Sequence, residues 1–225
     1  MPLKPHSAPA HIARRLPPLA LLRDTLLSNV DTIDARAPLT RAAWNNASIL
    51  PARVERSGRF GPPAAVRGAD GSFPFHWIYA AHDVFTAAWE AGLCLNDAEQ
   101  PGTFYIERGA RAALIATLRF DVPLKLVDLN GLASSKLGIF DDISDCDHAW
   151  CQWFGCMADA VIEREGGRVH GMIYPSRKHR GHDAIAISSR VLPQLLPVAS
   201  SSVVKFGDTA ACRELMADRC CVAPP

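Results

Sequence analysis

Two arginines, a tyrosine and a glutamate follow one another in one stretch of the chain. They are Arg41 in LTRAAW, Arg59 in SGRFGPP, Tyr79 in WIYAAHD and Glu90 in TAAWEAGL. An arginine guanidinium binds phosphate oxygens through paired hydrogen bonds, an aromatic ring stacks on a base or a pyridine, and a carboxylate stabilises an oxocarbenium-like centre. These side chains are therefore suited to holding a dinucleotide and breaking a glycosidic bond.

Each candidate also has a structural interpretation, which the sequence leaves open. Taken alone, Arg41 is more typical of a surface or ion-paired arginine, and Glu90 is compatible with the polar edge of an amphipathic helix. Tyr79 is compatible with a core aromatic whose hydroxyl is satisfied. Ser176, at the end of the segment HGMIYPS, is compatible with a turn cap. The basic run SRKHR from Ser176 to Arg180 favours either a solvated loop or a contact with a phosphate or an acidic partner.

The segments around these residues predict how they are positioned. A short strand over 39–44 is expected to carry Arg41, and a glycine- and proline-rich turn is expected to bring Arg59 close to a ligand. A strand rich in aromatic residues is expected to end at Tyr79. The next segment predicts a helix over 83–95 with Asp83 as its N-cap and Glu90 about two turns inside.

The rest of the chain alternates between segments typical of helices and segments typical of strands. Residues 1–15 are expected to be poorly ordered. Helices are predicted over 18–30, over 145–163 with an apolar stripe, and over 209–218 near the end. Strands are predicted on either side of Val122 and Pro123, over 170–176 with Ser176 at the end, and over 183–191 as the last strand of the core. Because these elements show no regular βαβ alternation, we expect an α+β fold and not a doubly wound parallel sheet.

Composition sets further limits. The 225 residues carry a net charge of +1, which gives no general electrostatic reason to expect nucleic acid or a membrane as partner. No apolar run is long enough to cross a bilayer, and no signal peptide is evident. The odd number of scattered cysteines, seven, favours a reduced, cytoplasmic protein.

Two kinds of ligand site are disfavoured. A metal site built from Cys146, His148, Cys151 and Cys156 would have spacings unlike those of structural zinc sites, so no metal is expected. The glycines form neither a GxGxxG turn nor a GxxxxGK[ST] loop, so a nucleotide site here would depend on side chains.

A second set of segments completes the pattern: VDLNGLASSKLGIFDD, CQWFGCMADAVIE and GMIYPSRKHRGHDAIAI. With the first set, they resemble the RES domain family of NAD-degrading toxins over roughly residues 38–190. The resemblance implies an α+β fold with a compact mixed sheet and flanking helices, similar to the fold of ADP-ribosyltransferases and diphtheria-type toxins. It divides the chain into an extension over 1–35, a catalytic domain over 36–192 and an extension over 193–225. The loop from Arg59 to Tyr79 and the first 35 or so residues exceed a minimal domain of this family.

The same resemblance implies roles for single residues. Glu90, Arg59 and Tyr79 are the expected catalytic residues, and Arg41, Arg59, Tyr79 and Ser176 the expected substrate-binding residues. NAD is then a substrate and no cofactor is needed, with either water or phosphate as the acceptor. The expected partners are an antitoxin of the Xre-like helical DNA-binding class and a second copy of the chain.

Two other functions stay open. An ADP-ribosyltransferase would use the same residues to transfer ADP-ribose to a protein. A catalytically silent module would use them to bind a nucleotide.

Overall fold

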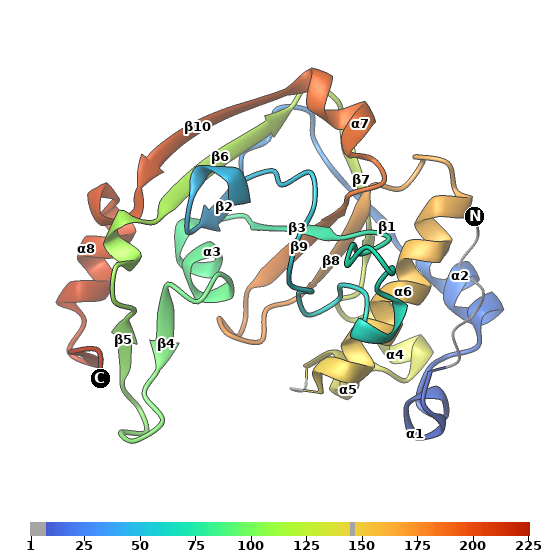
Figure 1. Cartoon of the computed structure of the whole chain (residues 1–225), viewed down its shortest axis with the longest axis horizontal. Helices are drawn as coiled ribbons and strands as arrows, with labels where there is room; N and C mark the ends of the chain where they lie inside the picture. The colour runs from blue at the N-terminus through green and yellow to red at the C-terminus, as the bar shows by residue number, and fades with distance from the viewer. Residues whose placement is uncertain (1–7, 145–146) are drawn as a thin grey trace.

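An eight-stranded mixed sheet forms the centre of the structure (Figure 1). The structure is a computed structural model that describes residues 8–144 and 147–225. The strand order is β1-β7-β8-β9-β3-β2-β6-β10, in which only β7 and β8 run parallel among the described pairs. The strands are β1 Val30–Ile33, β2 Leu39–Ala43, β3 Trp77–Ala81, β6 Leu114–Phe120, β7 Leu124–Asp128, β8 Gly171–Pro175, β9 Asp183–Ser188 and β10 Ala199–Lys205.

A second, three-stranded sheet lies on one side, and helices lie around both sheets (Figure 1). Its strands, in the order β11-β5-β4, are β4 Cys94–Asn96, β5 Phe104–Ile106 and β11 Cys221–Val222. The helices are α1 Ala10–Ala13, α2 Leu19–Ser28, α3 Val84–Glu90, α4 Leu132–Leu137, α5 Phe140–Ser144, α6 His148–Arg164, α7 Leu192–Leu195 and α8 Ala210–Ala217. This arrangement confirms the predicted α+β class with a mixed sheet.

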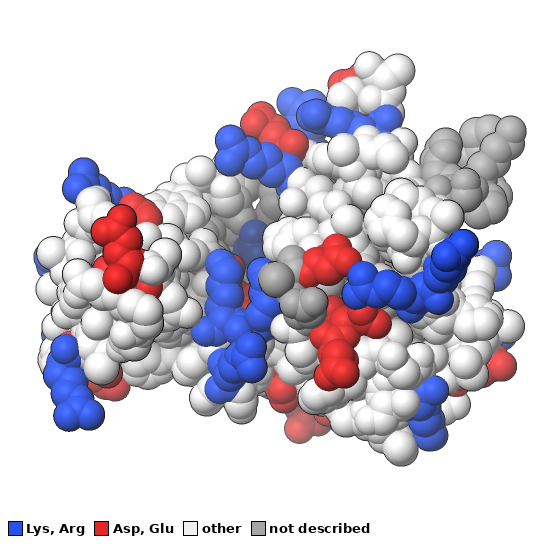
Figure 2. Space-filling view, turned by 90° about the horizontal axis from the view of Figure 1, so that it is seen from below, with Lys and Arg blue, Asp and Glu red and all other residues white. Residues whose placement is uncertain are grey.

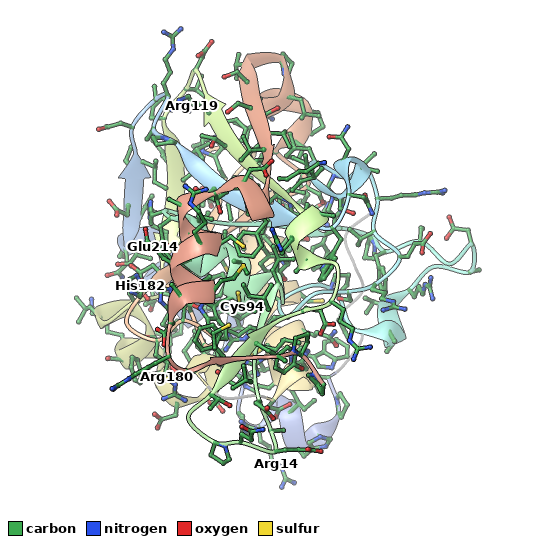
Figure 3. The ribbon with its side chains drawn as sticks, turned by 90° about the vertical axis from the view of Figure 1, so that its left-hand side faces the viewer. Arg14, Cys94, Arg119, Arg180, His182 and Glu214 are labelled. Atoms are coloured by element: carbon green, nitrogen blue, oxygen red, sulfur yellow. The ribbon has the colours of Figure 1, made fainter. Side chains whose placement is uncertain are left out.

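Two apolar cores hold the elements together. The main core lies between the large sheet and α6, whose predicted stripe buries Trp150, Phe154 and Val161. The smaller core lies beneath α8, where Cys94 is buried (Figure 3). Residues of α3 line the smaller core with Ala87 and Ala88. Helix α3 thus lies near the boundary between the two apolar cores.

Several predicted boundaries were wrong. The helix predicted over 83–95 ends at Glu90, and Cys94 already belongs to β4. Gly92 adopts a φ of +71°, in the left-handed region that favours glycine, and this turns the chain out of the helix. The strand predicted to end at Tyr79 continues to Ala81. The predicted N-cap is confirmed, since the Asp83 side chain accepts a hydrogen bond from the Thr86 amide.

The two ends of the chain also differ from the predictions. The strand over 183–191 is not the last one, because β10 pairs with β6 along seven residues. The sequence of β10 is rich in serine and mostly exposed, so it lacks the apolar pattern from which a core strand is predicted. Residues 8–15 are ordered, with Ile12 buried and Arg15 paired with Asp142 and Asp147. The prediction for residues 1–7 lies outside the described residues. Of the helices described, none is long and apolar enough to cross a membrane.

Candidate active site

The five predicted site residues meet where α3 packs on the sheet. Tyr79 and Glu90 lie on neighbouring elements, β3 and α3, and line two adjacent hollows. Arg41 lines one of the hollows and Arg59 the other. Ser176 contacts Glu90 directly. Residues spread along most of the chain therefore surround one carboxylate.

Glu90 is held by hydroxyl groups from the end of β8. The Ser176 hydroxyl donates to Glu90 Oε1 over 2.6 Å, and the Tyr174 hydroxyl lies 3.4 Å from Oε2. Tyr174 precedes Pro175 and Ser176 follows it, so the alternation of side chains along a strand places the two donors on the same side. The main-chain carbonyl of Glu90 lies 3.5 Å from Lys178 Nζ. These contacts fix the carboxylate at the last turn of α3.

Ser176 is 4 % exposed and has a defined hydrogen-bond direction. Its hydroxyl oxygen accepts from the His179 amide over 2.9 Å, while its proton points to Glu90. No described contact joins the Ser176 hydroxyl to a histidine ring, so a serine–histidine nucleophile is not formed here. The arrangement suits Ser176 to orient a carboxylate.

Tyr79 fixes the loop that carries Arg59. Its hydroxyl oxygen accepts a hydrogen bond from the Phe60 amide over 3.0 Å. A Cβ atom added at Gly58 would lie 2.7 Å from the Tyr79 ring, so only glycine allows the loop to approach this closely. Burial of the hydroxyl raises the pKa of Tyr79 well above its usual range. The hydroxyl is therefore protonated and able to donate at neutral pH.

Arg59 is 9 % exposed, and its guanidinium lies over two aromatic rings. The guanidinium carbon is 5.0 Å from the centre of the Phe60 ring and 5.8 Å from that of Tyr174. The loop backbone beside it packs on α6, where a Cβ atom at Gly155 would lie 1.8 Å from the Phe60 carbonyl oxygen. Aromatic faces attract cations, and so stabilise an arginine at this depth.

Arg41 is bound chiefly by main-chain oxygens. Its guanidinium donates to the Ser48 carbonyl over 2.7 Å and to the Tyr79 carbonyl over 2.6 Å. Burial lowers the pKa of Arg41 to about 10, so it is still charged at neutral pH. Arg41 thus ties β2, β3 and the loop after β2 together and places a positive charge beside Tyr79.

Five residues at the site were not among the predicted ones. Tyr174 follows from the strand period, since it stands two residues before Ser176. Arg177 and Lys178 belong to the basic run, whose sequence allowed a ligand contact. His148 was considered only for a metal site, and nothing in the sequence distinguished Trp44, whose side chain is 46 % exposed.

The two hollows differ in chemical character. The first has a volume of about 220 Å³ and is lined largely by apolar groups with Arg41: Ala42, Ala43, Trp44, Ser48, Ala80, Ala87 and Ala91. The second has a volume of about 180 Å³ and is strongly basic, with Gly58, Arg59, His148, Arg177 and Lys178. Figure 2 shows lysine and arginine side chains gathered in the middle of one face, between the part that carries α8 and the part that carries α5 and α6.

Other parts of the described chain offer less chemistry. A hollow of about 620 Å³ beside β5 and α8 contains Arg108, Arg111 and Glu107, but shares no residue with Glu90 or its donors. Among residues 8–144 and 147–225, no group of three or more histidine, cysteine, aspartate or glutamate side chains is placed to hold a metal ion. Cys146, part of the metal site considered from the sequence, lies outside the described residues.

A protein-family model described as the RES domain matches residues 32–205. No curated protein gives a significant match to the chain, and no solved structure does so either. The match covers all eight strands of the large sheet apart from the first two residues of β1, and every residue of the two hollows described above.

Proposed function

This chain belongs to the RES domain family, and we propose that it cleaves the N-glycosidic bond between nicotinamide and ribose in NAD. The observation that carries the proposal is the Glu90 carboxylate, held by Ser176 between an apolar hollow and a basic one. Enzymes of this family generally degrade NAD, which agrees with that chemistry.

Glu90 supplies the negative charge that the reaction needs. The nicotinamide in NAD is a cationic leaving group, so the bond breaks with little acid assistance, and positive charge develops on the ribose. A fixed carboxylate beside that carbon stabilises the charge as it develops. The hydrogen bond from Ser176 holds one carboxylate oxygen, and the other has a longer contact of 3.4 Å with the Tyr174 hydroxyl. Because a carboxylate oxygen can accept more than one hydrogen bond, this second oxygen can also accept a ribose hydroxyl.

The two hollows suit the two sides of the bond that breaks. The basic hollow, with Arg59, Arg177 and Lys178, suits the pyrophosphate, because cationic donors bind phosphate oxygens strongly. The apolar hollow beside Arg41 and Trp44 then takes the nicotinamide ring. Tyr79, which lines both, orients the ribose between them.

The bond from ribose C1′ to the pyridine nitrogen breaks, and its electron pair leaves with nicotinamide. In hydrolysis, a water oxygen bonds to C1′ and releases a proton, which gives ADP-ribose. In phosphorolysis, a phosphate oxygen bonds to C1′ and gives the phosphorylated sugar. The cationic side chains near Glu90 are compatible with an anionic acceptor as well as with water.

In a cell, the protein would act as a toxin, because this reaction would deplete NAD in the cytoplasm. A cognate antitoxin of the Xre-like class would neutralise it by covering the hollows. The gathered positive charge around them favours a partner segment rich in acidic residues (Figure 2). A purified neighbouring gene product of this class should stop NAD loss when mixed with the toxin, and continued NAD loss in a formed complex would contradict this mode of inhibition.

The experiment that tests the activity is a time course of the purified protein with NAD, with and without phosphate. Chromatography with mass detection would follow free nicotinamide and the ribose product. Nicotinamide with ADP-ribose indicates hydrolysis, and nicotinamide with the phosphorylated sugar indicates phosphorolysis. Intact NAD after prolonged incubation with folded protein would overturn the proposal and favour a nucleotide-binding module, whereas label on an added protein would indicate ADP-ribosyl transfer.

A further inference from the structure

The loop over residues 176–182 contacts both ends of helix α3. At the helix end, Ser176 donates to Glu90 over 2.6 Å. At the helix start, the His179 ring lies 2.8 Å from the Thr86 hydroxyl. The loop is also closed on itself, because the Ser176 amide donates to the His182 carbonyl over 2.8 Å.

The hydrogen bonds at the start of α3 have a determined direction. The Asp83 carboxylate accepts from the Thr86 amide over 2.8 Å and from the Thr86 hydroxyl over 2.7 Å. Because the single hydroxyl proton of Thr86 points to Asp83, its oxygen accepts the proton on Nδ1 of His179. Thr86 is 0 % exposed, so water does not replace these bonds.

The main-chain amide of His179 continues the contacts to the catalytic carboxylate, with donors that point toward Glu90 and away from Asp83. The His179 amide donates to the Ser176 hydroxyl oxygen over 2.9 Å, which leaves the hydroxyl proton for Glu90. A hydrogen-bonded path therefore runs from Asp83 through Thr86 and His179 to Ser176 and ends on Glu90. Its two ends lie on the same helix, one at the N-cap and one at the last residue.

We propose that Asp83, Thr86 and His179 are positioning residues, which hold the Ser176 hydroxyl against Glu90 through a His179 ring that is neutral and carries its proton on Nδ1. The kinetic tests of this inference rest on the proposed function, because they measure nicotinamide release. None of the three residues lines either hollow, so they act through Ser176 and do not touch the substrate.

The surroundings of His179 explain why its neutral form matters. Its ring stacks on that of His182, with centres 3.9 Å apart and an angle of 4°. Asp83 is the facing carboxylate, with Oδ2 4.0 Å from Nδ1 of His182. Burial and the neighbouring His182 lower the pKa of His179, and Asp83 opposes this only in part. Protonation is thus disfavoured in this geometry, and two stacked cations would weaken the loop that holds Ser176.

The first test compares His179→Ala with His179→Asn. Asparagine places an amide nitrogen near the position of Nδ1, so it can donate to Thr86, whereas alanine cannot. We expect the alanine variant to lose about 10- to 100-fold in kcat for nicotinamide release, because small displacements of catalytic groups have effects of this size. The asparagine variant should recover most of the loss. The control is His11→Asn, at an exposed position on α1, which should behave as wild type.

Wild-type kcat in the alanine variant would overturn the proposal, and so would equal losses in both variants. Thr86→Val reads the same hydrogen bond from the helix side and should match His179→Ala. It also serves if the alanine variant fails to fold. The pH profile is the second readout: because the pKa of His179 is lowered, its ring becomes protonated only at a pH below the ordinary value of about 6.5, and there wild type should lose a larger fraction of its activity than His179→Asn. Parallel profiles would show that the neutral ring is not required.

A readout without turnover separates this inference from the proposed function. Nitrogen-15 NMR of the histidine side chains reports which ring nitrogen carries the proton. We expect the His179 signal to show a protonated Nδ1 in the wild type and to change in Thr86→Val. If NAD stays intact but this result holds, the proposed function fails and the hydrogen-bonded path stands; an unprotonated Nδ1 overturns the path itself.

Discussion

The hydroxyl oxygen of Ser176 lies 2.6 Å from a carboxylate oxygen of Glu90, although 86 positions separate the two residues in the chain. The contact is partly buried and joins a neutral donor to a carboxylate acceptor. Hydrogen bonds to charged groups contribute about 1.5–3 kcal/mol. We therefore expect Ser176→Ala to lower kcat for nicotinamide release by roughly 10- to 100-fold, and Glu90→Gln to remove turnover.

A matched control is Ser134→Ala, in α4. Ser134 is also buried, but its hydroxyl donates to the Gly131 carbonyl, away from both hollows. Circular dichroism should show all three variants folded. Full activity in Ser176→Ala, or residual turnover in Glu90→Gln near the wild-type rate, would contradict the role given to this pair.

Gly58→Ala should impair catalysis through Tyr79. The new methyl group would meet the Tyr79 ring at 2.7 Å, so the ring or the loop with Arg59 must move. A displacement of this kind is expected to lower kcat/KM on the order of 100-fold. The control is Gly68→Ala in the same loop, where the methyl group would meet the end of the exposed Asp70 side chain at 2.7 Å and would otherwise make ordinary contacts with Ser72. Equal activity in the two variants, measured by nicotinamide release, would show that the close approach at Gly58 is unimportant.

Local pattern predicted the elements of the site better than their ends. The N-cap Asp83 and the apolar face of α6 follow from short-range rules. The end of α3 did not follow, because alanine-rich sequence continues past Glu90, and only the left-handed backbone of Gly92 stops it. Strand β10 was missed because its exposed serines show no pattern typical of a strand. It forms through its pairing with β6, which the local sequence does not encode.

The sequence predicted only some of the contacts between the site residues. Resemblance selected Glu90 and Ser176 separately, and sequence has no means of giving the 2.6 Å between them. The alternation of strand residues did contain one usable signal, since it puts Tyr174 on the same side as Ser176. The bonds from Arg41 to main-chain carbonyls depend on the packing of β2 against β3 and on the loop beyond, which no local pattern encodes.

The assignment of the two hollows predicts that Arg177 and Trp44 differ in which substrates they affect. Arg177 lines the basic hollow, so Arg177→Ala should raise KM for NAD by about tenfold but leave KM for nicotinamide riboside, which has no phosphate, nearly unchanged. Trp44→Ala should raise KM for both substrates, because both contain the nicotinamide ring. Phe140→Ala removes an aromatic ring of similar exposure on α5 and serves as control. An equal effect of Arg177→Ala on both substrates would argue against pyrophosphate in the basic hollow.

Acid should destabilise the folded protein through histidines whose protonated form is disfavoured by folding. Burial is the main cause that lowers the pKa of His76, His148, His170 and His179 below the ordinary value. The unfolded chain therefore binds protons first as the pH falls through about 6.5. The free energy of unfolding should decrease from there until the pH passes below the folded values. Urea titrations at several pH values between about 7.5 and 5.5, on either side of this pKa, would measure the decrease.

One variant assigns part of that decrease. The His76 ring donates from Nε2 to the Pro51 carbonyl over 2.9 Å, and glutamine can donate from a similar position without titrating. We expect His76→Gln to make the free energy of unfolding less dependent on pH in this window, whereas His11→Asn on the exposed face of α1 should leave the dependence as in wild type. If the free energy of unfolding of the wild type did not change between the two ends of the window, the lowered histidine pKa values would be contradicted, because proton uptake on unfolding requires that change.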